Sequence, residues 1–188
     1  MGDVGRIDDM TYIGHTLTGL AIGAAVLPGG LSRRRMLLGM AVFALLADVP
    51  DFPLRGWGHD RYDISHSIFV NGGIIAVVLL GLWILGKWKG LRVPLGVRVG
   101  GVCAWFSHML LDSMYNHGLG IRIYWPVSSE SLVLPVPWFS TLEYSPPPMN
   151  AHTARVFAIE LACYLPLLLV VLIVRHGLIL RARRKVRP

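Results

Sequence analysis

The sequence predicts an all-α fold, a polytopic transmembrane helical bundle of about five spans. Of the 188 residues, 54% are hydrophobic and only 15% are charged, which exceeds the apolar content of ordinary soluble domains. Three long apolar segments stand out: Ser67–Gly86 has no charge, Val93–Leu111 carries only Arg98, and Val156–Val174 carries only Glu160. Segments of this length and composition are typical of helices that cross a bilayer.

Two weaker segments complete the predicted bundle. Tyr12–Leu31 is rich in small residues and contains His15. Met36–Ala47 would extend only about 18 Å as a helix, so we interpret it as a short span with Arg33–Arg35 at the interface. We expect a single domain over residues 1–188. The sequence does not indicate an oligomeric state.

The basic residues indicate an orientation in the membrane. The net charge is +7, and threading five spans through the chain brings thirteen of the eighteen Lys and Arg residues to one side. The positive-inside rule places that side in the cytoplasm, with the N-terminus outside and the C-terminus inside. We therefore expect membrane lipids, and no nucleic acid, as partners of these charges. The thirteen residues are Arg33, Arg34, Arg35, Lys87, Lys89, Arg92, Arg98, Arg175, Arg181, Arg183, Arg184, Lys185 and Arg187.

A histidine and an aspartate lie at the end of the fourth predicted span. His108 and Asp112 are four residues apart, so on a helix they share one face. An imidazole nitrogen and a carboxylate oxygen at this separation can both reach one divalent ion. Because ionisable groups at membrane depth are costly, they favour a functional interpretation.

Other predicted helix ends on the outer side carry similar residues. His15 begins the first span, Asp48 and Asp51 flank the proline that ends the second, and His66 follows Ser65, which we expect to cap the third. Each alone has an ordinary explanation, such as an interfacial histidine or a solvated helix end. Together they predict a metal site for one or two divalent ions, with zinc expected and manganese as the alternative. The six candidate ligands are His15, Asp48, Asp51, His66, His108 and Asp112.

A long outer segment, residues 113–152, mixes aromatic residues with prolines and cannot form one regular helix. Trp125, Trp138 and Phe139 suggest a lid lying over the outer face, and an aromatic anchor without a catalytic part is an equal alternative. Glu160, one turn into the last span, needs a partner that the sequence does not name. The roles of His117, His152 and Arg155 are open.

The chain resembles the bacterial membrane-bound metal-dependent hydrolases, also described as LexA-binding, inner-membrane-associated hydrolases, over residues 12–126. The resemblance rests on an ordered set of short motifs: His15, Ala47-Asp48-Val49-Pro50-Asp51, His66-Ser67, Ser107-His108-Met109-Leu110-Leu111-Asp112 and Tyr124-Trp125-Pro126. That family usually carries His-Arg-Gly-x-x-His-Ser before its third span. Here Arg61 stands in place of the first histidine, and His59 or Asp63 could compensate.

A more distant likeness is to the zinc-dependent phospholipase C and P1 nuclease fold. It implies that Asp51, His66, His108 and Asp112 hold one ion and that Asp112 and His15 help to hold a second. The additional His-x-x-x-Glu motif of those enzymes is missing, because Val156 follows His152 at that spacing. A three-ion site is therefore not expected.

The resemblance and the predicted site together imply hydrolysis of an amphiphilic ester or phosphoester, such as a lipid, at the outer membrane surface. In this interpretation Asp48 and His66 are catalytic, with Asp48 either the base that orients water or a further ligand. One alternative is a non-catalytic scaffold whose metal joins helix ends or binds a partner. A transporter is a second, but it would place ionisable groups near the bilayer centre, where only Glu160 is a candidate. The substrate is not encoded in these patterns.

Overall fold

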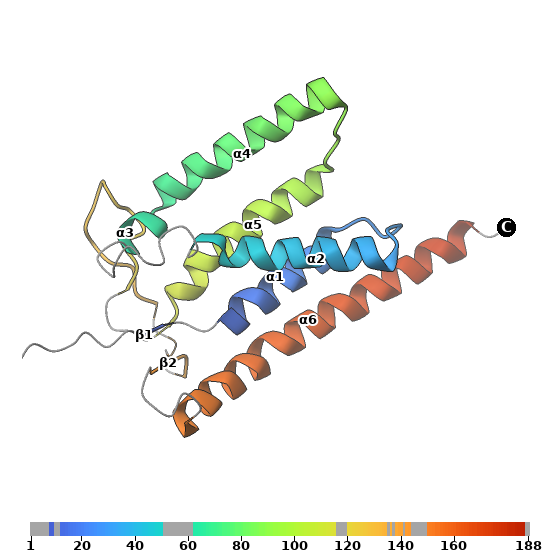
Figure 1. Cartoon of the computed structure of the whole chain (residues 1–188). Helices are drawn as coiled ribbons and strands as arrows, with labels where there is room; N and C mark the ends of the chain where they lie inside the picture. Colours follow the sequence, from blue (N-terminus) through green and yellow to red (C-terminus); the bar gives the residue numbers. More distant parts are fainter. Residues whose placement is uncertain are drawn as a thin grey trace, which may run out of the picture.

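The computed structural model describes residues 8–9, 12–50, 62–115, 120–134, 136, 138–140, 142–143 and 150–186. It confirms the all-α class (Figure 1). A two-stranded antiparallel sheet, β1 (Asp8–Asp9) with β2 (Leu142–Glu143), is the minor β component. The helices are α1 (Tyr12–Val26), α2 (Arg33–Asp48), α3 (Tyr62–Ser65), α4 (Ile68–Lys89), α5 (Leu95–Asp112) and α6 (Ala151–Val186).

Two of the five long helices, α4 and α6, are long and apolar enough to cross a membrane. The 15 residues of α1 and the 16 of α2 correspond to about 22–24 Å of helix, less than the roughly 30 Å of a bilayer core. Five spans are therefore not shown, and the number beyond these two helices stays a prediction.

Helix α1 lies at the centre of the bundle and packs against α2, α5 and α6. Small residues allow this packing. A Cβ atom added at Gly19 would lie 2.5 Å from the Phe43 carbonyl oxygen and 2.7 Å from the Ala44 Cα. The backbones of α1 and α2 can approach this closely only with glycine at that position, as in the small-residue interfaces of membrane helices.

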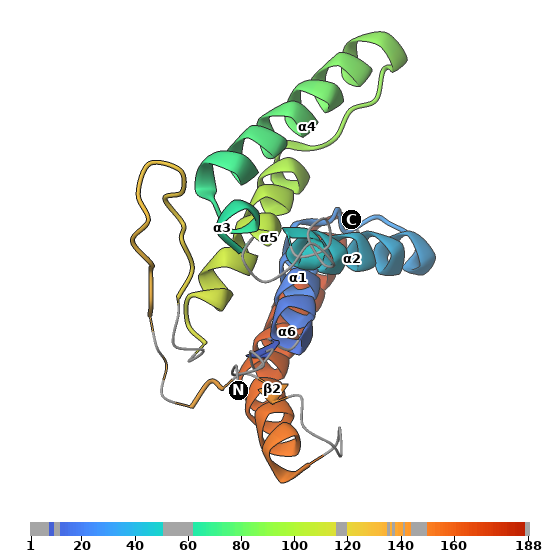
Figure 2. The ribbon, with the colours of Figure 1, turned by 60° about the vertical axis from the view of Figure 1, so that its left-hand side comes forward.

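Helix α4 stands apart from the other long helices, as Figure 2 shows. Within α4 only Asn71 is buried, and apolar side chains such as Val77 and Trp83 are exposed. An apolar surface of this extent is expected of a helix that contacts lipid.

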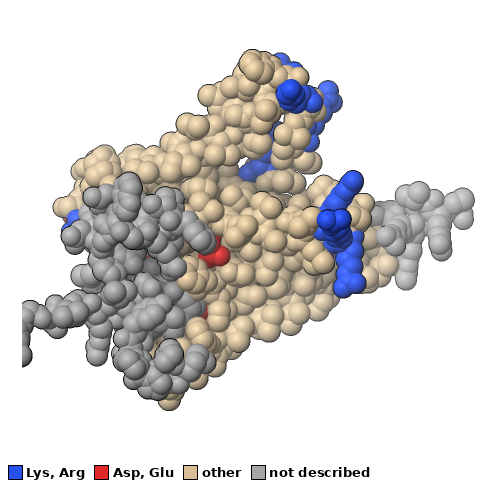
Figure 3. All heavy atoms as spheres, viewed as in Figure 1, with Lys and Arg blue, Asp and Glu red and all other residues tan. Residues whose placement is uncertain are grey.

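The chain direction brings one set of helix ends together. The starts of α1, α4 and α6 and the ends of α2 and α5 lie at the same end of the molecule (Figure 1). The opposite end carries most of the Lys and Arg side chains visible in Figure 3. There Arg175 donates hydrogen bonds to the carbonyl oxygens of Leu27 (2.6 Å) and Pro28 (3.1 Å), which follow α1.

Candidate metal centre

Four side chains from three parts of the chain meet at the end of the bundle that is poor in basic residues. His15 comes from the first turn of α1, His66 from the link between α3 and α4, and His108 and Asp112 from the end of α5. All four are buried, with side chains no more than 2% exposed. Sequence spacing alone paired only His108 with Asp112.

The Asp112 carboxylate is the centre of this cluster. Its Oδ1 lies 3.0 Å from the Nε2 atom of His15. Its Oδ2 lies 2.5 Å from the Nε2 atom of His66 and 3.1 Å from that of His108. The His15 and His108 rings are tilted against each other with their centroids 4.5 Å apart. Three imidazole groups thus face one carboxylate.

The backbone determines the tautomer of a neutral His108. Its Nδ1 atom lies 2.8 Å from the Ala47 carbonyl oxygen, which can only accept a hydrogen bond, so Nδ1 carries a proton. The Nε2 lone pair of the neutral ring then points toward the Asp112 carboxylate at 3.1 Å. Two electron-rich atoms at this distance require a cation, either a second proton on His108 or a metal ion. Anchoring of one ring nitrogen by a backbone carbonyl is typical of metal-binding histidines.

His15 indicates which cation fits better. Among the described residues, neither of its ring nitrogens has a hydrogen-bond partner, and neither has Asp112 Oδ1, although Nε2 and Oδ1 are only 3.0 Å apart. A protonated His15 would pair with Oδ1 across this distance, but without the geometry of a hydrogen bond. A shared metal ion would satisfy both Nε2 and Oδ1.

The spacing of three residues also fits a metal. Ligand atoms of His15, His108 and Asp112 all lie within 4.8 Å of one another. Neighbouring ligand atoms in a tetrahedral zinc site are roughly 3.3 Å apart, given bonds of about 2.0–2.1 Å. His15 Nε2 lies 3.0 Å from Asp112 Oδ1 and His108 Nε2 lies 3.1 Å from Asp112 Oδ2, so each histidine is close to this separation from one oxygen of the carboxylate. Three protein ligands leave a position for water, as in catalytic zinc sites.

His66 contacts the same carboxylate by a hydrogen bond. Its Nε2–H donates to Asp112 Oδ2 at 2.5 Å, because a carboxylate can only accept. Its Nδ1 then accepts from the Ser65 hydroxyl at 2.8 Å. His66 lies outside the group of ligand atoms formed by the other three residues. Its predicted roles, as a ligand and as a catalytic group, stay predictions.

The predicted cap of α4 is wrong by two residues. The N-cap is Ser67, whose hydroxyl accepts from the backbone N–H groups of Phe69 and Val70. Ser65 instead ends the one-turn helix α3, which hydropathy did not predict because four residues give no period. His66 therefore precedes α4 and does not lie in its first turn.

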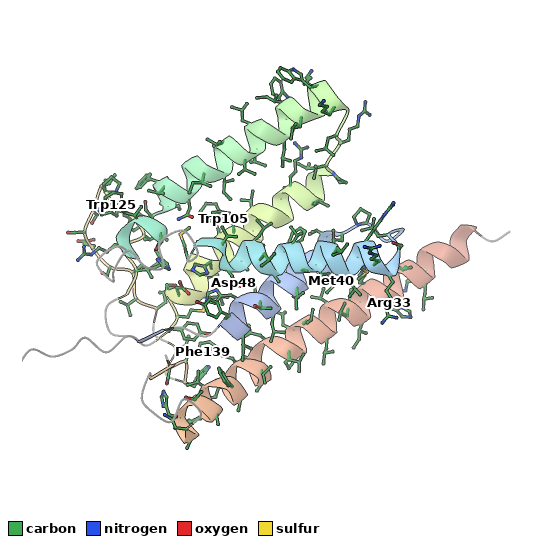
Figure 4. The ribbon with its side chains drawn as sticks, in the orientation of Figure 1. Arg33, Met40, Asp48, Trp105, Trp125 and Phe139 are labelled. Atoms are coloured by element: carbon green, nitrogen blue, oxygen red, sulfur yellow. The ribbon has the colours of Figure 1, made fainter. Side chains whose placement is uncertain are left out.

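Asp48, the last residue of α2, lies at the same end of the molecule, as Figure 4 shows. The Thr16 hydroxyl donates to its Oδ2 at 3.1 Å, and Asp48 directly follows the carbonyl that anchors His108. Asp48 is not one of the three residues whose ligand atoms cluster. Four residues considered above lie outside the described residues: Asp51, His59, Arg61 and His117. The side chain of Asp63 also lies outside them.

Glu160 finds its partners beside the cluster. It is 1% exposed, and it accepts hydrogen bonds from the Tyr115 hydroxyl at 2.7 Å and from the Gly14 backbone N–H at 3.1 Å. Burial raises the pKa of the Tyr115 hydroxyl, and the neighbouring Glu160 raises it further, so this donor stays protonated. Gly14 precedes His15, and Tyr115 follows Asp112 by three residues. Glu160 thus connects α6 to both segments that supply ligands.

Asn71 makes a second connection that the sequence analysis missed. Its side-chain amide donates to the carbonyl oxygens of Ser65 (2.7 Å) and Ser67 (2.9 Å), on either side of His66. Its Oδ1 accepts from the Trp105 indole N–H at 2.7 Å. The sequence signal for this role was a single amide side chain in an otherwise apolar segment, because a buried amide needs hydrogen-bond partners.

The described residues of the outer segment between 120 and 143 form no helix, as predicted. Its backbone is bonded to the end of α5, where the Leu134 N–H donates to the Ser113 carbonyl (2.6 Å), and to the start of α4, where the Ser67 hydroxyl donates to the Trp125 carbonyl. Phe139 stacks between Tyr115 and Tyr164, with centroid distances of 5.3 and 5.8 Å. This segment therefore borders the cluster, while its role as lid or anchor stays a prediction.

Comparison with known proteins gives one family. A family model described as YdjM inner membrane protein matches residues 10–181. No curated protein and no solved structure matches the chain.

Proposed function

We propose that this chain, which belongs to the YdjM inner membrane protein family, is a membrane-embedded metal-dependent hydrolase. The observation that carries the proposal is the orientation of His108. Its Nδ1–H is committed to the Ala47 carbonyl, so its Nε2 lone pair faces the Asp112 carboxylate, where a cation is required. The proposal treats residues 1–188 as one domain.

The residues of the cluster and the neighbouring Asp48 have separate roles in the proposed reaction. His15, His108 and Asp112 would hold the ion, with zinc expected and manganese as the alternative. A bound divalent ion lowers the pKa of its water toward 7 and polarises the ester or phosphoryl oxygen. His66 donates to Asp112 Oδ2 and so fixes the direction in which the carboxylate points. Asp48, held by the Thr16 hydroxyl, is the proposed base that takes a proton from water.

The proposed substrate is an amphiphilic ester or phosphoester, such as a lipid. Support comes from the family's inner-membrane location and from two helices able to span a bilayer. Their starts lie at the same end of the molecule as the cluster (Figure 1). A substrate dissolved in the membrane could reach that end without leaving the lipid phase.

A direct experiment tests the hydrolase proposal. Wild-type protein, purified in detergent without chelators, is expected to carry at least one zinc or manganese ion per chain by elemental analysis. It should hydrolyse a member of a panel of phospholipids, phosphomonoesters and carboxyl esters. Chelation should remove this activity, and the same metal should restore it. Protein without stoichiometric metal would contradict the proposal.

A metal-joined scaffold is the second candidate, favoured by the complete burial of His66, His108 and Asp112. In that case chelation should lower the melting temperature, and no substrate in the panel should be turned over. The same purified sample therefore separates the two functions.

The orientation is a further prediction. The basic end of the molecule in Figure 3 should face the cytoplasm, with the His/Asp cluster on the outer side. A reporter fused after Pro188 should read cytoplasmic, and a tag inserted after Ser128 should be labelled by a membrane-impermeant reagent in intact spheroplasts. Labelling only after the membrane is opened would invert the orientation.

A further inference from the structure

An apolar cleft of about 200 Å³ lies between α2, α4 and α5. Its exposed wall surface is entirely apolar. Helix α4 forms one wall and, as noted, packs closely against none of the other long helices, so the cleft separates it from the bundle. The lining includes Phe43, Leu46, Ile75, Leu79, Val102 and Trp105.

All three walls lead toward the His/Asp cluster. On α5 the lining residues Arg98, Val102 and Trp105 recur every three or four positions, and the same helical stripe continues to His108 and Asp112. On α2 the lining residue Leu46 is followed by Ala47, whose carbonyl anchors His108. On α4 the lining residue Ile75 lies one turn after Asn71.

A hydrogen bond between helices marks the end of the cleft nearest the cluster. The Trp105 indole N–H donates to Asn71 Oδ1 at 2.7 Å and so links α5 to α4 at this point. Asn71 in turn binds the carbonyl groups on both sides of His66. Figure 4 shows Trp105 at the same end of the bundle as Asp48, far from Arg33. One end of the apolar cleft thus adjoins the polar cluster.

We propose that this cleft binds one acyl chain of a lipid substrate whose polar head lies at the His/Asp cluster. The inference rests on the proposed hydrolase function. It specifies the substrate as a lipid ester with at least one acyl chain. An apolar wall running into a buried polar cluster is complementary to an amphiphile of that shape.

The size of the cleft supports this occupant over a protein partner. A helix of a second copy, about 10 Å across, would not fit a cavity of 200 Å³. The volume is also smaller than the roughly 300–1,000 Å³ of pockets that enclose drug-sized ligands, so it fits part of one hydrocarbon chain. Arg98 lines the cleft two turns before Trp105, away from the cluster. The alternative arrangement is a lipid bound in the reverse orientation, with its phosphate at Arg98 and its acyl chain pointing toward the His/Asp cluster.

Photocrosslinking tests the occupant directly. The full-length protein would be placed in vesicles of phosphatidylethanolamine and phosphatidylglycerol that contain a phospholipid with a diazirine at the end of one acyl chain. Peptide mapping of the wild-type protein should find the label on cleft residues of α4 and α5, such as Leu79 and Val102. A second probe, with its diazirine near the glycerol, should label the Asn71 and Trp105 end. Head-group labelling at Arg98 instead would overturn the proposal.

Two glycines of α5 provide a matched pair of variants. A Cβ at Gly101 meets only Leu46 Cδ1, at 3.7 Å, so Gly101→Leu can extend into the cleft without forcing the helices apart. A Cβ at Gly96 has no neighbour within 4 Å, so Gly96→Leu adds the same side chain to open space. We expect Gly101→Leu to lower labelling of the cleft by about tenfold and Gly96→Leu to leave it unchanged. Equal labelling of the wild type and both variants would contradict the proposal that the cleft binds an acyl chain. Label spread evenly over the outer faces of α4 and α6 would contradict it as well.

Failure of this inference and failure of the hydrolase proposal look different. If both hold, Gly101→Leu lowers kcat/KM for a long-chain lipid but not for a butyryl ester. If the enzyme is active and the two substrates respond equally, the cleft assignment is wrong and the function stands. If the wild type hydrolyses neither substrate but its cleft labelling depends on Gly101, the cleft binds lipid and the hydrolase proposal fails.

Discussion

Asp112→Asn is expected to lose both bound metal and turnover, because the Nε2 atoms of three histidines lie within 3.1 Å of this carboxylate. Asparagine keeps the shape but removes the negative charge that balances a dication. Loss of a single outer hydrogen-bond partner of a ligand already costs about 10–100-fold in metal affinity or activity, so loss of a central ligand should cost more than about 100-fold. His108→Ala, which removes a nitrogen ligand, should give the same result.

Elemental analysis, kcat/KM and thermal denaturation of the same samples would measure this effect. Glu130→Gln is the matched control, since it neutralises an exposed acid in the outer segment. The metal site is refuted if Asp112→Asn and His108→Ala match the wild type in metal content, activity and melting temperature. Lower stability without any activity to lose would support the scaffold alternative.

Replacing Glu160 with leucine should cause the largest loss of folding stability. The substitution leaves the Tyr115 hydroxyl and the Gly14 N–H buried without their hydrogen-bond acceptor. Each unsatisfied group costs about 1–3 kcal/mol, so we expect a decrease of about 2–6 kcal/mol in the free energy of unfolding. Metal content should fall as well, because these two groups lie beside His15 and Asp112 in the chain.

Glu160→Gln separates hydrogen bonding from charge. A glutamine can accept from Gly14 through its oxygen and donate to the Tyr115 oxygen through its amide, so most of the stability should return. The measurement is the melting temperature and metal content in detergent, with Glu130→Leu as the exposed control. A Glu160→Leu protein as stable as the wild type would show that this buried carboxylate does not hold the helices together.

Local patterns were enough to predict the all-α class and the approximate positions of the five long helices. Apolar segments such as Ser67–Gly86 can be read from the chain because hydropathy is a property of neighbouring residues. The i,i+4 pair His108 and Asp112 was predictable for the same reason, since helical periodicity alone puts both on one face. The error at Ser65 and Ser67 was a local one, since either serine can cap a helix.

The sequence by itself therefore determined that apolar helices form and that histidines and acids lie at their ends. Only the tertiary structure decided which of those ends meet. It joined Glu160 to Gly14 across 146 positions of the chain and His66 to Asp112 across 46, and it left α4 beside an apolar cleft. Such contacts depend on helix packing angles and on the burial of each polar group against a distant partner. Neither property is present in the composition or periodicity of a single segment.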